Sequence, residues 1–102
     1  MKIAIPTVNG NLCMHFGHCE KFAIFHIADN AIASREDITP PAHEPGVLPA
    51  WLGGMDVNII IAGGMGQRAQ MLFNENDIKV VTGAPNTNAE LVVKSYLDNS
   101  LV

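Results

Sequence analysis

The stretch VNIIIA at residues 57–62 is followed at once by the glycine-rich turn GGMG at residues 63–66. A short, nearly continuous apolar run is typical of a central strand that is covered on both faces of its sheet. Residues 67–76 then show helical spacing, and residues 78–81 read as another short buried strand. This strand–helix–strand order predicts two parallel strands that are joined by a right-handed crossover.

The N-terminal half predicts a meander of strands. Residues 2–6 (KIAIP) suit a first strand with Ile3 and Ile5 on one face. Residues 22–27 (FAIFHI) are rich in aromatic and β-branched side chains, and we expect them to form a hairpin with residues 31–36. The two-residue connection Asp29-Asn30 suits a tight turn.

Two further helices complete the predicted order. Residues 47–52 form a short helix candidate that we expect to end at Gly53-Gly54. Thr87 and Glu90 have the spacing of a capping box, and the helix after them has apolar residues at i, i+3 and i+4 spacing. We therefore predict a single α/β domain over residues 1–102, in the order β-β-β-α-β-α-β-α.

The composition restricts the class of partner. Only 16% of the 102 residues are charged, against about 25% in typical globular chains, and 48% are hydrophobic, which argues against disorder. The net charge is −4, and the six Lys and Arg do not cluster, so neither nucleic acid nor a membrane surface is favoured. The stretch Met1–Pro6 is too short for a signal peptide. We expect a cytoplasmic protein with reduced cysteines.

Both cysteines and two of the four histidines fall within seven residues, Cys13-Met14-His15-Phe16-Gly17-His18-Cys19. Thiolate and imidazole are ligands for zinc, copper and iron–sulfur species. The spacing is not that of a zinc ribbon, so a closed structural zinc site is not predicted. An open site at Cys13, His15, His18 and Cys19, which the cargo or another chain completes, is one interpretation. The other is that both cysteines pack as small apolar residues, with Phe16 anchoring the loop.

His43 lies in the segment His43-Glu44-Pro45-Gly46, where Pro and Gly hold the chain with little loss of entropy. If this loop meets the Cys13–Cys19 loop at one end of the sheet, His43 adds a ligand from the opposite side. Taken alone, it is equally a solvated loop histidine or a cap for the following helix. For His26, which lies between apolar neighbours, we expect an ordinary position in a strand.

The turn Gly63-Gly64-Met65-Gly66 joins the buried strand to a helix, a geometry in which backbone N–H groups bind anions. The pattern is neither a dinucleotide fingerprint nor a P-loop. Its glycines are explained equally well by a tight turn. No nucleophile elbow and no paired carboxylates on the first strand are present, so hydrolase chemistry is not favoured.

These motifs resemble the dinitrogenase iron–molybdenum cofactor biosynthesis family, which includes NifX, the C-terminal domain of NifB, and NafY. The resemblance covers nearly the whole chain. It rests on four ordered motifs at consistent spacing: KIAIP at 2–6, HFG at 15–17 followed by Phe22, HEPG at 43–46 with LP-x-WL at 48–52, and IIAGGMG-x-x-A at 60–69 followed by Gly83-Ala84.

The resemblance implies a ribonuclease H-like three-layer fold, with a five-stranded mixed sheet and helices on its faces, but no nuclease activity. It also implies an iron–sulfur or molybdenum–iron–sulfur cluster precursor as cargo, with other cofactor-assembly proteins as partners. A histidine of the His-Phe-Gly region is implicated in holding the cluster, so the site carries over to His15, with Phe16 and Gly17. Another soft metal as cargo, a homodimer, and a link to nitrogen fixation are left open.

The sequence thus favours a non-catalytic carrier or scaffold that binds a metal–sulfur cluster near His15, Cys19 and His43 and passes it to a partner. Soft ligands suit such a cargo, and an incomplete ligand set suits transfer. The second hypothesis is a regulatory domain that senses a small anionic ligand with Gly63, Gly64 and Gly66.

Overall fold

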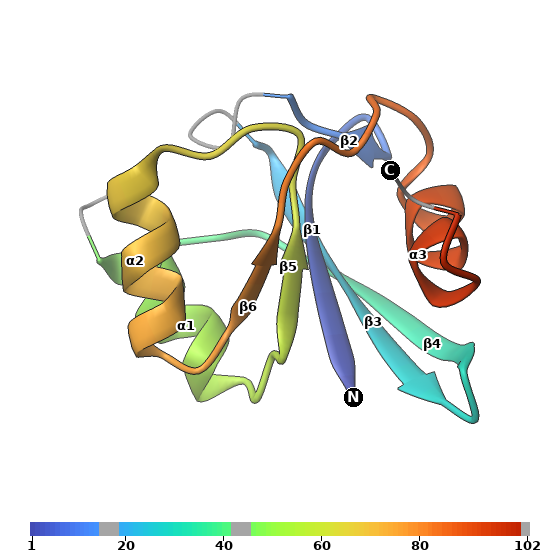
Figure 1. Ribbon diagram of the computed structural model, residues 1–102, viewed down its shortest axis with the longest axis horizontal. Helices are drawn as coiled ribbons and strands as arrows, with labels where there is room; N and C mark the ends of the chain where they lie inside the picture. Colours follow the sequence, from blue (N-terminus) through green and yellow to red (C-terminus); the bar gives the residue numbers. More distant parts are fainter. Residues whose placement is uncertain (15–18, 42–45, 101–102) are drawn as a thin grey trace.

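The structure, a computed structural model, describes residues 1–14, 19–41 and 46–100. It contains a mixed sheet with helices on both of its faces (Figure 1). The elements follow one another in the order β1 (Lys2–Val8), β2 (Asn11–Leu12), β3 (Lys21–Ala28), β4 (Ala31–Ile38), α1 (Val47–Gly54), β5 (Ile59–Ile61), α2 (Gln67–Glu75), β6 (Lys79–Val81) and α3 (Ala89–Leu97).

The sheet has the strand order β4-β3-β1-β5-β6. β1 is antiparallel to β3 and parallel to β5, and β5 is parallel to β6, which confirms the crossover that the sequence predicts. The predicted five strands are all present. β2 was not predicted; it pairs with the end of β1 and brings the sheet to six strands. With only two residues, β2 shows no periodicity from which it could be predicted.

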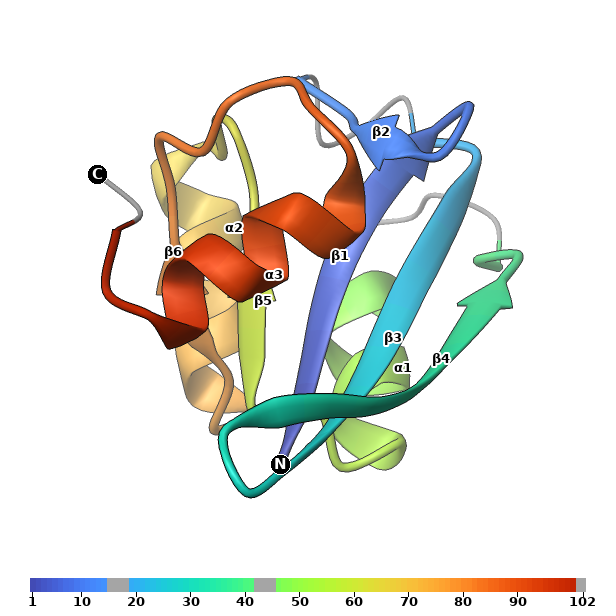
Figure 2. The same ribbon diagram turned by 90° about the vertical axis from the view of Figure 1, so that its right-hand side faces the viewer.

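Helices α1 and α2 cover one face of the sheet, and α3 covers the other (Figures 1 and 2). Because side chains alternate along a strand, Ile3 and Ile5 of β1 pack toward α3 against Val92 and Val93. Ala4 belongs to the second apolar cluster, which holds the buried side chains of α1 and α2. β5 is buried at every residue, as a strand covered on both faces must be.

The β3–β4 hairpin has its turn where it was predicted. Asp29 and Asn30 have φ angles of 52° and 61°, the left-handed conformation that a two-residue hairpin turn requires. His26 occupies an ordinary position in β3, as expected, with its Nε2 3.5 Å from Oε1 of Glu36 on the neighbouring strand. The register of β3 on β4 shifts between His26 and Ile27.

The helix α1 ends at Gly54, within the predicted Gly53-Gly54 stretch, and Met55 is its C-cap. Gly53 lies against the end of α2: a Cβ at this position would come within 3.3 Å of the Cβ of Asn76. A larger residue at Gly53 would therefore crowd Asn76, and the glycine allows the two helices to pack closely.

The predicted capping box at Thr87 was wrong. The backbone carbonyl of Thr87 accepts a hydrogen bond from the N–H of Leu12 at 2.9 Å, which ties the residue to β2. The N-cap is Asn88, whose Oδ1 accepts from the N–H of Glu90 at 2.9 Å. The helix therefore begins one residue later than the spacing of Thr87 and Glu90 indicated.

The substitution Asn88→Ala removes this cap, and we expect it to lower the free energy of unfolding by about 1 kcal/mol. Urea unfolding measures the change. Asn74→Ala is the matched control, because Asn74 is exposed within α2 and alanine is the better helix former there. Equal stability of the two variants would show that Asn88 does not act as a cap.

Candidate functional site

The two ends of the Cys13–Cys19 segment are both attached to the end of β1. The N–H of Cys13 donates to the carbonyl of Pro6 at 2.8 Å, and the N–H of Glu20 donates to the carbonyl of Thr7 at 2.9 Å. The carboxyl ends of β1, β5 and β6 lie at this same edge, since these strands are parallel. In open α/β sheets, ligands bind at such an edge.

Both cysteines are buried thiols outside any disulfide, with exposures of 7% for Cys13 and 8% for Cys19. They belong to the apolar cluster on the α1 and α2 face, together with Phe22 and Leu52. Phe22 in turn packs edge to face against Trp51 of α1, with ring centroids 5.7 Å apart. The interpretation of the cysteines as packed apolar residues therefore describes this structure correctly, and it is compatible with a second role as ligands.

Burial raises the pKa of the Cys19 thiol from its ordinary value of 9.0 to about 11, and the neighbouring Cys13 adds to the rise. A hydrogen bond from the backbone acts in the opposite direction but is the smallest of the three effects. At neutral pH Cys19 is thus a neutral thiol. A thiophilic metal must displace its proton, and the metal's charge then compensates the buried thiolate.

The turn after β5 lies directly beside the Cys13–Cys19 segment. A Cβ on Gly63 would come within 2.9 Å of Sδ of Met14 and within 3.4 Å of Cδ2 of Leu12. The nearest such atom for Gly64 is the carbonyl oxygen of Met14, at 3.9 Å. The structure therefore brings two of the predicted site segments together, with the thioether of Met14 between them.

The glycines of this turn have different roles. A side chain at Gly63 would crowd Met14, so this steric contact alone explains why a glycine is present there. No atom of the described residues lies within 4 Å of a Cβ built on Gly66, which is the N-cap of α2 and whose backbone is extended. Packing against the described part of the chain therefore does not explain Gly66. Nearby, the side-chain amide of Gln70 donates to the carbonyl of Met65 at 2.9 Å and fixes the outer part of the turn.

Several predicted site residues lie outside the described residues: His15, Phe16, Gly17, His18 and His43. Among the described residues that follow His43 in the chain, Leu48 lies in the first turn of α1 and packs in the same cluster as Cys13 and Cys19. α1 therefore begins on the sheet face that carries the thiols. Over residues 1–14, 19–41 and 46–100, no group of three or more His, Cys, Asp or Glu is arranged to hold a metal ion.

Met14 is a site residue that was not predicted from the sequence. Its side chain is 46% exposed, although a methionine is normally buried, and its sulfur lies at the glycine turn. The available signal was its position directly after Cys13, since a thioether is a soft donor like the thiolate beside it. In the described part of the chain, no helix is long and apolar enough to cross a membrane.

The fold and the site together define the class of protein. It is a small mixed α/β domain with a thiol pair at the edge of the sheet where the parallel strands end. The family model for the dinitrogenase iron-molybdenum cofactor matches residues 1–99. The chain belongs to this family, as its motifs indicate.

The chain is also similar to other proteins over nearly its whole length. Protein MJ0580 of Methanocaldococcus jannaschii is 37% identical, over 99% of this chain and 89% of that protein. The crystal structure of PH0822 is 30% identical with a TM-score of 0.92, and the match covers 100% of this chain and 93% of that one. The apo form of the orange protein from Desulfovibrio gigas shares the fold, with a TM-score of 0.77 at 18% identity over 99% and 90% of the two chains.

Replacing Gly63 by alanine tests the contact with Met14. The new Cβ must displace the flexible end of the methionine, so we expect a loss of about 1 kcal/mol of stability, at the low end for overpacking, and a shift of the Met14 methyl signal in NMR spectra. Gly66→Ala is the control, because a Cβ there meets no atom of residues 1–14, 19–41 and 46–100 within 4 Å and the φ of −60° suits alanine. A Met14 signal that moves equally in both variants would contradict the contact.

The raised pKa of Cys19 is tested in a double variant, Cys13→Ser with Tyr96→Phe, in which no tyrosinate forms and the ultraviolet absorbance of the thiolate reports on Cys19 alone. Burial is the larger cause, so Cys19 should still titrate above 9.0. Denaturation in urea should return the midpoint to the ordinary value. A midpoint in the folded variant at or below that of the denatured chain would show that Cys19 is not buried.

Proposed function

We propose that the protein is a non-catalytic carrier, which binds a metal–sulfur cluster or cofactor precursor of the iron–molybdenum type and passes it to a partner. Membership of the dinitrogenase iron-molybdenum cofactor family associates the chain with biosynthesis of that cofactor. The observation that carries the finer proposal is the thiol pair Cys13 and Cys19. Both thiols are buried in one cluster, and the segment between them is attached at both ends to β1.

In this proposal, Cys13 and Cys19 hold the cargo together with His15, His18 and His43. The thiols are neutral and packed when the carrier is empty, and they become thiolates as the cargo binds. Because a metal–sulfur cluster contains several metal ions, this set of donors still leaves positions on the cluster open, which transfer to another cofactor-assembly protein requires. Phe16 and Gly17 border the cargo, and the backbone amides of Gly63, Gly64 and Gly66 donate hydrogen bonds to its sulfide or to an organic acid ligand.

The fold also supports the more specific proposal of a ribonuclease H-like fold. The strand order β4-β3-β1-β5-β6, with one antiparallel side and one parallel side, is the mixed arrangement that the ribonuclease H-like proposal requires. We keep that label as part of the proposal. A shared fold does not bring nuclease activity.

Loading the purified protein under anaerobic conditions tests the carrier function. Iron(II) with sulfide, or tetrathiomolybdate, is the probe, and visible charge-transfer absorption is the measurement. We expect His15→Ala to abolish this absorption and Cys19→Ala and His43→Ala to weaken it. His26→Ala is the matched control, since His26 lies in β3 and faces Glu36. An unchanged spectrum in the combined variant of His15, Cys19 and His43 would overturn the proposal.

A second candidate is an anion-sensing domain that uses the glycine turn. It is favoured by Gly66, which caps α2 without a side chain and has no atom of the residues that the structure describes within 4 Å of a Cβ built on it. It predicts that phosphate raises the melting temperature in the absence of any metal, whereas chloride at equal ionic strength does not. The carrier proposal predicts stabilisation by the metal–sulfur probe instead.

A further inference from the structure

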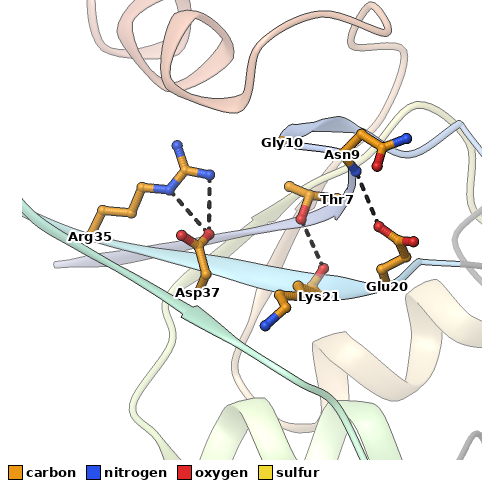
Figure 3. Close-up of a pocket in the computed structure, with 7 residues that line it drawn as sticks. All are labelled: Thr7, Asn9, Gly10, Glu20, Lys21, Arg35 and Asp37. Atoms are coloured by element: carbon orange, nitrogen blue, oxygen red, sulfur yellow. Dashed lines mark hydrogen bonds and ion pairs between the residues drawn. The ribbon is translucent and has the colours of Figure 1, made fainter.

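A pocket of about 350 Å³ lies on the sheet face opposite the cysteines, between the β1–β2 turn and the strands β3 and β4 (Figure 3). The pairing register places its side chains on that face. Thr7 is opposite Lys21, while Arg35 and Asp37 are opposite Phe25 and Ala23. Phe25 and Ala23 belong to the apolar cluster under α3, whereas the cysteines belong to the other cluster.

Arg35 and Asp37 form a fixed pair at one end of the pocket. Nε and Nη2 of Arg35 both donate to Oδ1 of Asp37, at 3.1 and 3.0 Å. The guanidinium carbon also lies 5.1 Å from the centre of the Phe25 ring, which holds the group by a cation–π contact. Among the described residues, Oδ2 of Asp37 and Nη1 of Arg35 have no hydrogen-bond partner, so each remains available to a ligand.

A second pair of opposite charges borders the pocket. Lys21 is the first residue of β3, and Glu20 directly precedes it. Oε1 of Glu20 accepts a hydrogen bond from the N–H of Asn9 at 3.2 Å, which holds the carboxylate over the β1–β2 turn. The ammonium of Lys21 makes no ion pair within residues 1–14, 19–41 and 46–100. Unlike Arg35 and Asp37, these two charges do not neutralise each other through a contact.

The buried base of the pocket is polar. Thr7 is only 3% exposed, and its hydroxyl donates to the backbone carbonyl of Lys21 at 3.2 Å. Because that proton is committed, the lone pairs of the Thr7 oxygen are left to accept a hydrogen bond from a ligand.

The balance of charge determines the class of ligand. The four charged side chains sum to zero, two positive and two negative. A simple anion in the pocket would face Glu20 and Asp37, and a simple cation would face Lys21 and Arg35. We propose that the pocket binds a small zwitterion, specifically the head group of a free α-amino acid, with its carboxylate toward Lys21 and Arg35 and its ammonium toward Asp37, Glu20 and Thr7. The volume suits such a ligand.

This site is independent of the proposed cargo site, because it uses other residues on the other face of the sheet. Amide NMR spectra of the apo-protein, recorded during titration with glycine, L-alanine and L-glutamine, test it directly. We expect saturable shifts at Thr7, Asn9 and Gly10. Glutaramate and 4-aminobutanamide, which are L-glutamine without its ammonium and without its carboxylate, should bind at least about tenfold more weakly, because each loses its charged hydrogen bonds.

Two variants locate the site. Lys21→Met and Asp37→Asn should each raise the Kd for L-glutamine about tenfold or more. Glu36→Gln is the matched control: Glu36 is the neighbour of Asp37 in β4 but faces His26, and its loss should leave the Kd unchanged. The amide spectrum of each variant without ligand verifies its fold. The proposal is overturned if none of the three amino acids gives saturable shifts at the pocket, if glutaramate or 4-aminobutanamide binds as tightly as L-glutamine, or if Glu36→Gln weakens binding as much as Asp37→Asn.

Discussion

β1 lies at the centre of the sheet, and both the packing and the functional edge depend on its two neighbours. It pairs with β3 on one side and with β5 on the other, and five successive residues, from Ile3 to Thr7, are buried. Alternate side chains of this one strand enter the two apolar clusters. The carbonyls at its end then hold both ends of the Cys13–Cys19 segment. Shifting β1 by one residue would exchange its two faces and detach that segment.

Most of the helices and strands could be predicted because their patterns are local. The run at residues 57–62 and the Asp29-Asn30 turn each carry their own signal, and the structure has both. The error at the start of α3 arose where a tertiary contact decided the outcome. The backbone carbonyl of Thr87 accepts a hydrogen bond from the N–H of Leu12, and α3 begins one residue later than predicted. That contact is not visible in a sequence window.

The sequence could predict the part of the candidate site whose residues lie close together in the chain. The spacing of Cys13 and Cys19 indicated a shared environment, and the two thiols do belong to one cluster. His15, His18 and His43 remain predictions. The proximity of Met14 to Gly63 and the polar pocket at Arg35 could not be predicted, because both depend on the pairing of strands that are distant in sequence. The register shift at His26 adds to this difficulty, since it changes which side chains share a face of β4.

The long-range pairing of β1 also affects the order in which the chain becomes compact. Ile3 pairs with Ile59, more than half of the chain away, whereas β3 and β4 are joined by a two-residue turn. Local pairings close at a smaller entropic cost and form sooner. During synthesis from the N-terminus, Cys13 and Cys19 emerge well before Ile60, Phe73 and Ile78, which share their cluster. The two thiols are therefore shielded only in the finished chain, and a nascent chain on the ribosome presents them to the solvent.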